Sequence, residues 1–141
     1  MNIFLDANVL VSVLNKEYPV FTYSSRIFSL TENKRFNVFT SPVCMAIAFY
    51  FSEKKSGTVL AKRKMEMLAS KIYITDVGEK EIVEALRDRR VIDFEDGIEY
   101  FAAYNSHCKC IITEDVNDFH FSSLEVLNCS GFIEKYAFPK T

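Results

Sequence analysis

The sequence is poor in the features that mark several classes of protein. It has only four glycines and three prolines in 141 residues, and no low-complexity run, so linkers and internal repeats are not expected. No apolar run approaches the roughly 20 residues that span a bilayer, and the chain does not open with the basic and apolar regions of a signal peptide. We therefore expect one domain over residues 1–141, in the cytoplasm and with no membrane attachment.

Basic charge and paired cysteines are also lacking. The formal net charge is −2, so the chain has no basic footprint of the kind typical of nucleic-acid binders. A nuclease is not excluded, because an acidic site that holds a divalent metal lowers the net charge by itself. The four cysteines, whose spacing fits no zinc site, predict free, buried thiols in a reducing compartment; they are Cys44, Cys108, Cys110 and Cys129.

What the chain does have is a regular alternation of short apolar runs and helical patterns. The expected strands are residues 3–5, 36–40, 72–74, 110–112 and 124–127. The main expected helices are residues 20–31, 43–51, 59–70, 94–105 and a helix that begins at Asp76 or Gly78 and ends at about residue 87. Such alternation predicts an α/β fold with a parallel sheet covered by helices on both faces. The two most uniformly apolar strands, Ile3–Leu5 and Cys110–Ile112, are expected side by side in its middle. The nearly all-apolar segment Val43–Phe51 predicts a helix buried between the sheet and its neighbours.

The first strand ends at a carboxylate. Asp6 follows Ile3–Leu5, and Asn8 then stands where an N-cap would, before Val9 and Leu10 begin a helical pattern. Taken alone, an aspartate at a strand end is more often a turn or cap residue than a functional one. The carboxyl edge of a parallel sheet is nevertheless where ligands bind in such folds, so other acids at the same edge would favour a site.

Further acids fall at equivalent places in the chain. They are Asp93, Glu95 and Asp96 at a helix start, and Glu114, Asp115 and Asp118 after the strand 110–112. Acids in a first helical turn have an ordinary explanation, since they complement the helix dipole. If three segments bring their acids to one edge, however, the charges repel unless protons or a cation neutralise them. Mg²⁺ or Mn²⁺ with oxygen ligands is the simplest neutraliser, and such a site can activate water for phosphodiester hydrolysis.

Three stretches together resemble the motifs of PIN-domain proteins. They are FLDANVLV (residues 4–11), DFEDGIEYFAA (93–103) and ITEDVNDF (112–119). The similarity is strongest to VapC-like toxin ribonucleases of type II toxin–antitoxin systems. The resemblance implies a three-layer α/β/α sandwich with a mostly parallel central sheet, and a metal-dependent endoribonuclease that hydrolyses RNA. It also implies an Mg²⁺ or Mn²⁺ cofactor, a cognate antitoxin and a homodimer.

The same resemblance assigns roles residue by residue. Asp6 matches the first metal-site aspartate, and Asp96 matches the one that opens the later helix. Asp115 and Asp118 match the two acids of the last motif, and Thr113 matches a hydroxyl that supports the site. We therefore predict these four aspartates as the catalytic and metal-binding residues.

One position departs from the family pattern. A glutamate is expected six residues after the serine that starts the third helix; here that serine is Ser41 and the sixth residue is Ile47, and no acid lies between Ser41 and Ser52. Asp93, Glu95 and Glu114 are candidates to replace the lost charge. The alternative function is therefore a weakened PIN fold that binds RNA or a protein without cutting. If Ile47 occupies the place of the glutamate, its side chain should face the acidic pocket.

Overall fold

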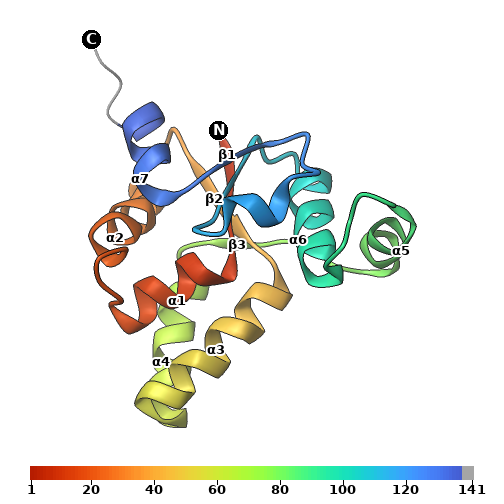
Figure 1. The fold of residues 1–141 in the computed structure, drawn as a ribbon. Helices are drawn as coiled ribbons and strands as arrows, with labels where there is room; N and C mark the ends of the chain where they lie inside the picture. Colours follow the sequence, from red (N-terminus) through yellow and green to blue (C-terminus); the bar gives the residue numbers. More distant parts are fainter. Residues whose placement is uncertain (138–141) are drawn as a thin grey trace.

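The computed structural model describes residues 1–137 and is built on one parallel sheet (Figure 1). Its strands are β1 (Asn2–Leu5), β2 (Asn37–Thr40), β3 (Tyr73–Ile74), β4 (Cys110–Ile112) and β5 (Glu125–Leu127). The strand order is β3-β2-β1-β4-β5, and all four pairings are parallel. The expected central pair is confirmed: β1 is the middle strand and β4 lies beside it. Leu5 is opposite Ile112 in this pair, so the two strands end at the same level.

Helices cover both faces of the sheet, as expected for a three-layer α/β/α arrangement. In Figure 1 the strands lie between the pair α5–α6 and the group formed by α1, α2 and α7. The helix bounds are α1 (Ala7–Asn15), α2 (Phe21–Ser29), α3 (Pro42–Ser56), α4 (Thr58–Ala69), α5 (Glu79–Arg87), α6 (Phe94–Asn105) and α7 (Cys129–Phe132), with 3₁₀ turns at Leu30–Glu32 and Val116–Phe119 and a π turn at Ile133–Ala137. Within residues 1–137, none of the helices combines the length and apolarity that crossing a membrane requires.

The two central strands of the sheet are shielded from solvent. All side chains of Ile3–Leu5 and Cys110–Ile112 are fully buried, as expected for strands covered on both faces. Burying each large apolar side chain contributes roughly 1.5–3 kcal/mol to folding, so this pair of strands anchors the edge at which Asp6 stands. The four cysteines are free and buried, which confirms the expectation of unpaired thiols.

Two local expectations are wrong. Helix α1 begins at Ala7 with Asp6 as its N-cap, so Asn8 lies inside the first turn and does not cap. Helix α3 is longer than residues 43–51 and is not enclosed: Tyr50 is 56% exposed and Phe51 is 44% exposed. The reason is that α3 packs mainly on α1 and α4. It therefore buries only a stripe at helical spacing and leaves the other apolar side chains partly or largely exposed.

Candidate functional site

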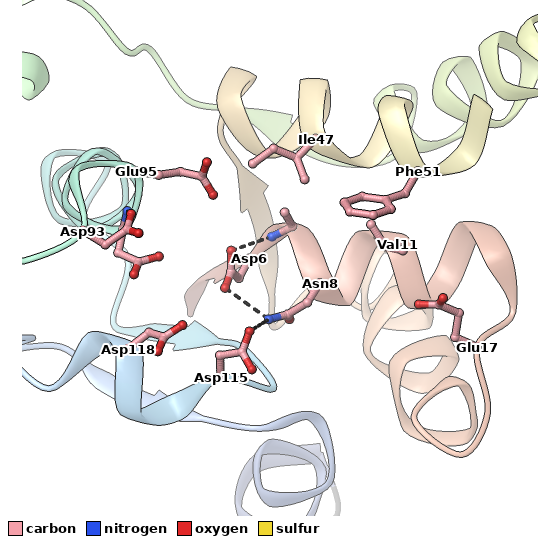
Figure 2. Close-up of a pocket in the computed structure, with 12 residues that line it drawn as sticks. Asp6, Asn8, Val11, Glu17, Ile47, Phe51, Asp93, Glu95, Asp115 and Asp118 are labelled. Atoms are coloured by element: carbon pink, nitrogen blue, oxygen red, sulfur yellow. Dashed lines mark hydrogen bonds between the residues drawn. The ribbon is translucent and has the colours of Figure 1, made fainter. Parts of the chain in front are cut away.

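A hollow of about 420 Å³ opens at the carboxyl end of the central strands (Figure 2). It is lined by carboxylates from the end of β1, the start of α6 and the segment after β4, namely Asp6, Asp93, Glu95, Asp96, Asp115 and Asp118. All four aspartates predicted from the sequence therefore line one pocket. Glu17, which the sequence did not single out, also lines it, beyond a strip of apolar side chains formed by Val11 and Phe51.

Asp6 is held rigidly at the end of β1. Its side chain is only 7% exposed. Oδ1 accepts a hydrogen bond from the backbone N–H of Ala7 at 2.6 Å, and Oδ2 accepts one from Thr113 Oγ1 at 2.7 Å. The backbone N–H of Asp6 donates to the carbonyl of Ile112 at 3.0 Å. These contacts fix the carboxylate in place before any ligand arrives, and they give Thr113 the supporting contact that the family resemblance implied.

Asn8 ties the two ends of the chain together at the site. Its Nδ2 group lies 3.0 Å from Thr113 Oγ1 and 3.2 Å from Asp115 Oδ2, and its Oδ1 accepts the backbone N–H of Glu114 at 3.1 Å. The dashed lines of Figure 2 show Asn8 between Asp6 and Asp115. The sequence placed Asn8 at a helix cap, and this bridging position became visible only once β1 and β4 were adjacent.

The start of α6 forms the opposite wall of the pocket. Asp93 caps this helix, its Oδ1 accepting the backbone N–H of Asp96 at 3.2 Å. Burial, followed by the nearby charges of Asp93, Asp118 and Asp6, raises the pKa of Asp96 to about 7. Burial and the charges of Asp93 and Asp6 also raise the pKa of Glu95. These shifts have the sign expected for carboxylates that face one another in a pocket with few counter-charges.

Glu99 is a site residue that the sequence analysis missed. It lies one turn after Asp96 on α6 and its side chain is fully buried. Oε1 accepts a hydrogen bond from the thiol of Cys44 on α3 at 3.1 Å, whereas Oε2 has no hydrogen-bond partner among the described residues. Burial, followed by the charge of Asp6, raises the pKa of Glu99 to about 11. In the metal-free protein this carboxyl therefore keeps its proton at neutral pH.

The tightest cluster of possible metal ligands differs from the predicted set. In the part of the chain that the structure describes, one group has three ligand atoms all within 4.8 Å of one another, and it consists of Asp6, Cys44 and Glu99. A sequence signal for Glu99 existed: it is a charged residue in the middle of the largely apolar segment Ile98–Ala103, and its spacing of three from Asp96 puts both acids on the same face of a helix.

The acids that were candidates to replace the missing glutamate lie in different places relative to the pocket. Glu114 turns away from the pocket, because its Oε2 accepts the backbone N–H of Cys129 at the start of α7. Asp93 and Glu95 line the pocket. Ile47 lines it too, and Figure 2 shows its side chain above Asp6. The expectation that the side chain of Ile47 faces the acidic pocket is therefore met.

The donor set fits a hard divalent cation. Oxygen atoms of carboxylates dominate the pocket, and such ligands are preferred by Mg²⁺ and Mn²⁺. Among residues 1–137, the ion pairs are Lys71–Glu32, Arg90–Asp88 and Lys135–Glu125, so none involves an acid of the pocket. The repulsion within the pocket is therefore left for protons or a bound cation to relieve.

Comparison with known proteins agrees with this geometry. The model of the PIN domain family matches residues 2–117. Ribonuclease VapC1 of Aquifex aeolicus is 23% identical over 141 residues, covering 95% of this chain and 94% of that protein.

Two solved structures have the same fold. VapBC2 from Rickettsia felis, bound to a DNA fragment from its promoter, superposes with a TM-score of 0.69 at 18% identity, covering 91% of this chain and 98% of that one. Mycobacterium tuberculosis VapC20, described as a toxin that cleaves the sarcin–ricin loop, gives 0.69 at 16% identity, covering 88% and 98%. The fold, the acidic pocket and the family match lead to one conclusion: this chain belongs to the PIN-domain family.

Proposed function

We propose that this protein is a metal-dependent endoribonuclease of the VapC toxin type, with Asp6, Asp96, Asp115 and Asp118 as its metal-binding and catalytic carboxylates. The observation that carries the proposal is the convergence of these four side chains in one pocket at the end of the sheet. The relative named Ribonuclease VapC1, of nearly the same length, and the RNA-cleaving VapC20 support the substrate class.

The residues of the pocket have separate tasks in this proposal. Bound Mg²⁺ or Mn²⁺ supplies an activated water and stabilises the negative charge that develops on the phosphate. Thr113 holds the proposed ligand Asp6 in place through a hydrogen bond. Asn8 in turn donates a hydrogen bond to Asp115, the second proposed ligand on this side. Asp96 and Asp118 complete the negative wall on the side of α6. Two apolar side chains of α3, Ile47 and Phe51, border the pocket opposite that wall.

RNA cleavage read on a gel tests the function. The wild-type chain should cut a mixed RNA substrate with Mn²⁺ or Mg²⁺ and fail to cut it in EDTA. Asp118→Asn should lower the rate at least 10-fold, because it removes a charge of the pocket while the exposed side chain makes no contact on which the fold depends. Asp76→Asn is the matched control, since Asp76 is exposed and does not line the pocket. Metal-independent cutting, or no cutting with either ion, would contradict the proposal.

Binding without cleavage is the second candidate function. It is favoured by one observation, the isoleucine that lines the pocket where the family has a glutamate. RNA that is retained by the wild-type chain in Mn²⁺ but not shortened would support this candidate. In that case Asp118→Asn should leave RNA retention unchanged.

An antitoxin partner follows from the same assignment. The solved relative named VapBC2 is an assembly of a VapC toxin with its antitoxin. This chain exposes apolar side chains on α3 and α4, including Tyr50, Val59 and Leu60, and clusters of this kind often mark interaction surfaces. A homodimer is proposed on the same grounds.

A further inference from the structure

We propose that Glu99 supplies a further carboxylate to the metal site, in place of the glutamate that α3 lacks at Ile47. This inference rests on the proposed function, because it assigns a further ligand to the same metal. Neither the sequence motifs nor the comparisons assign a role to this residue.

The first argument is position. Glu99 lies three residues after Asp96 on α6, which places both side chains on the face of the helix that looks toward β1. One of its carboxylate oxygens lies within 4.8 Å of an oxygen of Asp6. Glu99 therefore stands next to the carboxylate that anchors the site, and is shielded from solvent beneath it.

The second argument is the contact that Glu99 makes with α3. It contacts Cys44, whose thiol donates to Oε1. Cys44 and Ile47 are three residues apart on α3, so their Cα atoms are separated by about 4.5 Å along the helix axis. Glu99 therefore brings a carboxylate from α6 to within about one helical turn of residue 47 on α3, where the family glutamate would be attached.

The third argument is the unused oxygen. Oε2 of Glu99 is buried without a hydrogen-bond partner among the described residues, and no lysine or arginine in residues 1–137 forms an ion pair with this side chain. Buried polar atoms are nearly always satisfied in folded proteins. A free carboxylate oxygen beside Asp6 is the arrangement that a divalent cation with oxygen ligands completes.

A purely structural role for Glu99 makes a different prediction. A permanently protonated Glu99 would serve only as a hydrogen-bond donor to Asp6, and glutamine would reproduce that role, since its amide both donates and accepts. Glu99→Gln is therefore the decisive variant. It preserves size and hydrogen-bonding capacity and removes only the ability to carry charge.

The test measures Mn²⁺ binding to the full chain in two ways. One is isothermal titration calorimetry, and the other is the rise in melting temperature that the metal causes. Glu99→Gln should weaken Mn²⁺ binding at least 10-fold and remove most of the rise in melting temperature. Glu66→Gln is the control and should change the affinity less than threefold, because Glu66 is an exposed glutamate of α4 that does not line the pocket. Adding Ile47→Glu to Glu99→Gln should recover affinity, because it returns a carboxylate to the site from α3.

The outcomes separate the two proposals. Wild-type affinity in Glu99→Gln would overturn the role of Glu99, and so would an equal loss of affinity in the control Glu66→Gln. A wild-type chain that binds Mn²⁺ with help from Glu99 but leaves RNA intact would uphold this inference and overturn the proposed nuclease. A wild-type chain that binds no Mn²⁺ would overturn both.

Discussion

The two helices that flank the acidic pocket have opposite characters. On the side of α3 the lining side chains are Ile47 and Phe51, both apolar, and on the side of α6 they are Asp93, Glu95 and Asp96. Glu99 adds a further acid behind the α6 wall. Of these two helices, only α6 therefore contributes charge to the pocket. Under our proposal for Glu99, the difference between the two helices means that the site keeps its number of acids while a different helix supplies one of them.

The largest effect is expected on the charged wall. Asp96→Asn should lower the rate of RNA cleavage about 1000-fold, equivalent to about 4 kcal/mol of transition-state stabilisation, because it removes a proposed ligand from the centre of the pocket. Ile47→Ala on the opposite wall should change the rate less than 10-fold. Initial cleavage rates under saturating Mn²⁺ provide the comparison. Similar losses in both variants would show that the two walls contribute alike.

The next effect concerns stability and pH. The pKa of Glu99 is raised to about 11 in the folded protein from 4.5 for an ordinary glutamate. Its contribution to stability is therefore complete below pH 4.5 and declines as the pH rises toward 11. Asp96 acts in the same direction, over the range from 3.8 to about 7. For Glu99 alone, the free energy of unfolding should fall by about 3 kcal/mol between pH 5 and pH 7.

Glu99→Gln should remove that part of the decline. Urea unfolding in EDTA at pH 5, 6 and 7 measures it, and the variant should be more stable than the wild type at pH 7, by an amount on the order of 2–3 kcal/mol. The Cys44 thiol keeps its acceptor, since the glutamine carbonyl replaces Oε1. Parallel pH profiles for the two proteins would contradict the burial of a carboxyl that loses its proton only at high pH.

The smallest effect is expected from charging the apolar wall. Ile47→Glu removes a partly buried apolar side chain and adds a negative charge beside Asp6, so the metal-free protein should lose about 1–2 kcal/mol of stability. Saturating Mn²⁺ should reverse the loss, since the new carboxylate then faces a cation. Melting curves with and without the metal separate the two contributions. An equal loss in both conditions would mean that Ile47 is ordinary packing and that its alignment with the family glutamate is wrong.

The sequence predicted the sheet and the gathering of the four aspartates because both follow from local patterns. Short apolar runs identify the strands, and the carboxyl ends of parallel strands share one edge. It did not predict the roles of Asn8 and Glu99. Asn8 bridges residues more than one hundred positions apart, and Glu99 acquires its character from burial against Cys44 and Asp6. Neither contact exists until the helices are packed.

The exposed side of α3 was missed for a related reason. Hydrophobicity identifies a helix but does not say how much of its surface the rest of the chain can cover. Tyr50 and Phe51 read as core, yet α3 extends beyond the sheet and presents them outward. Apolar residues of this kind are distinguished from core only by the packing of α1 and α4.

The link between Asp6 and Thr113 has a consequence for the order in which the protein becomes competent during its synthesis. Asp6 leaves the ribosome well before the hydroxyl that fixes its carboxylate, which belongs to a residue 107 positions later. Asp96 and Asp115 also come long after Asp6, by 90 and 109 positions. A growing chain therefore carries a scattered set of acids and no pocket until β4 has been made and has paired with β1. If the pocket cuts RNA, the messenger and the ribosome that produce this protein meet the assembled site only after β4 and the segment that follows it have been translated.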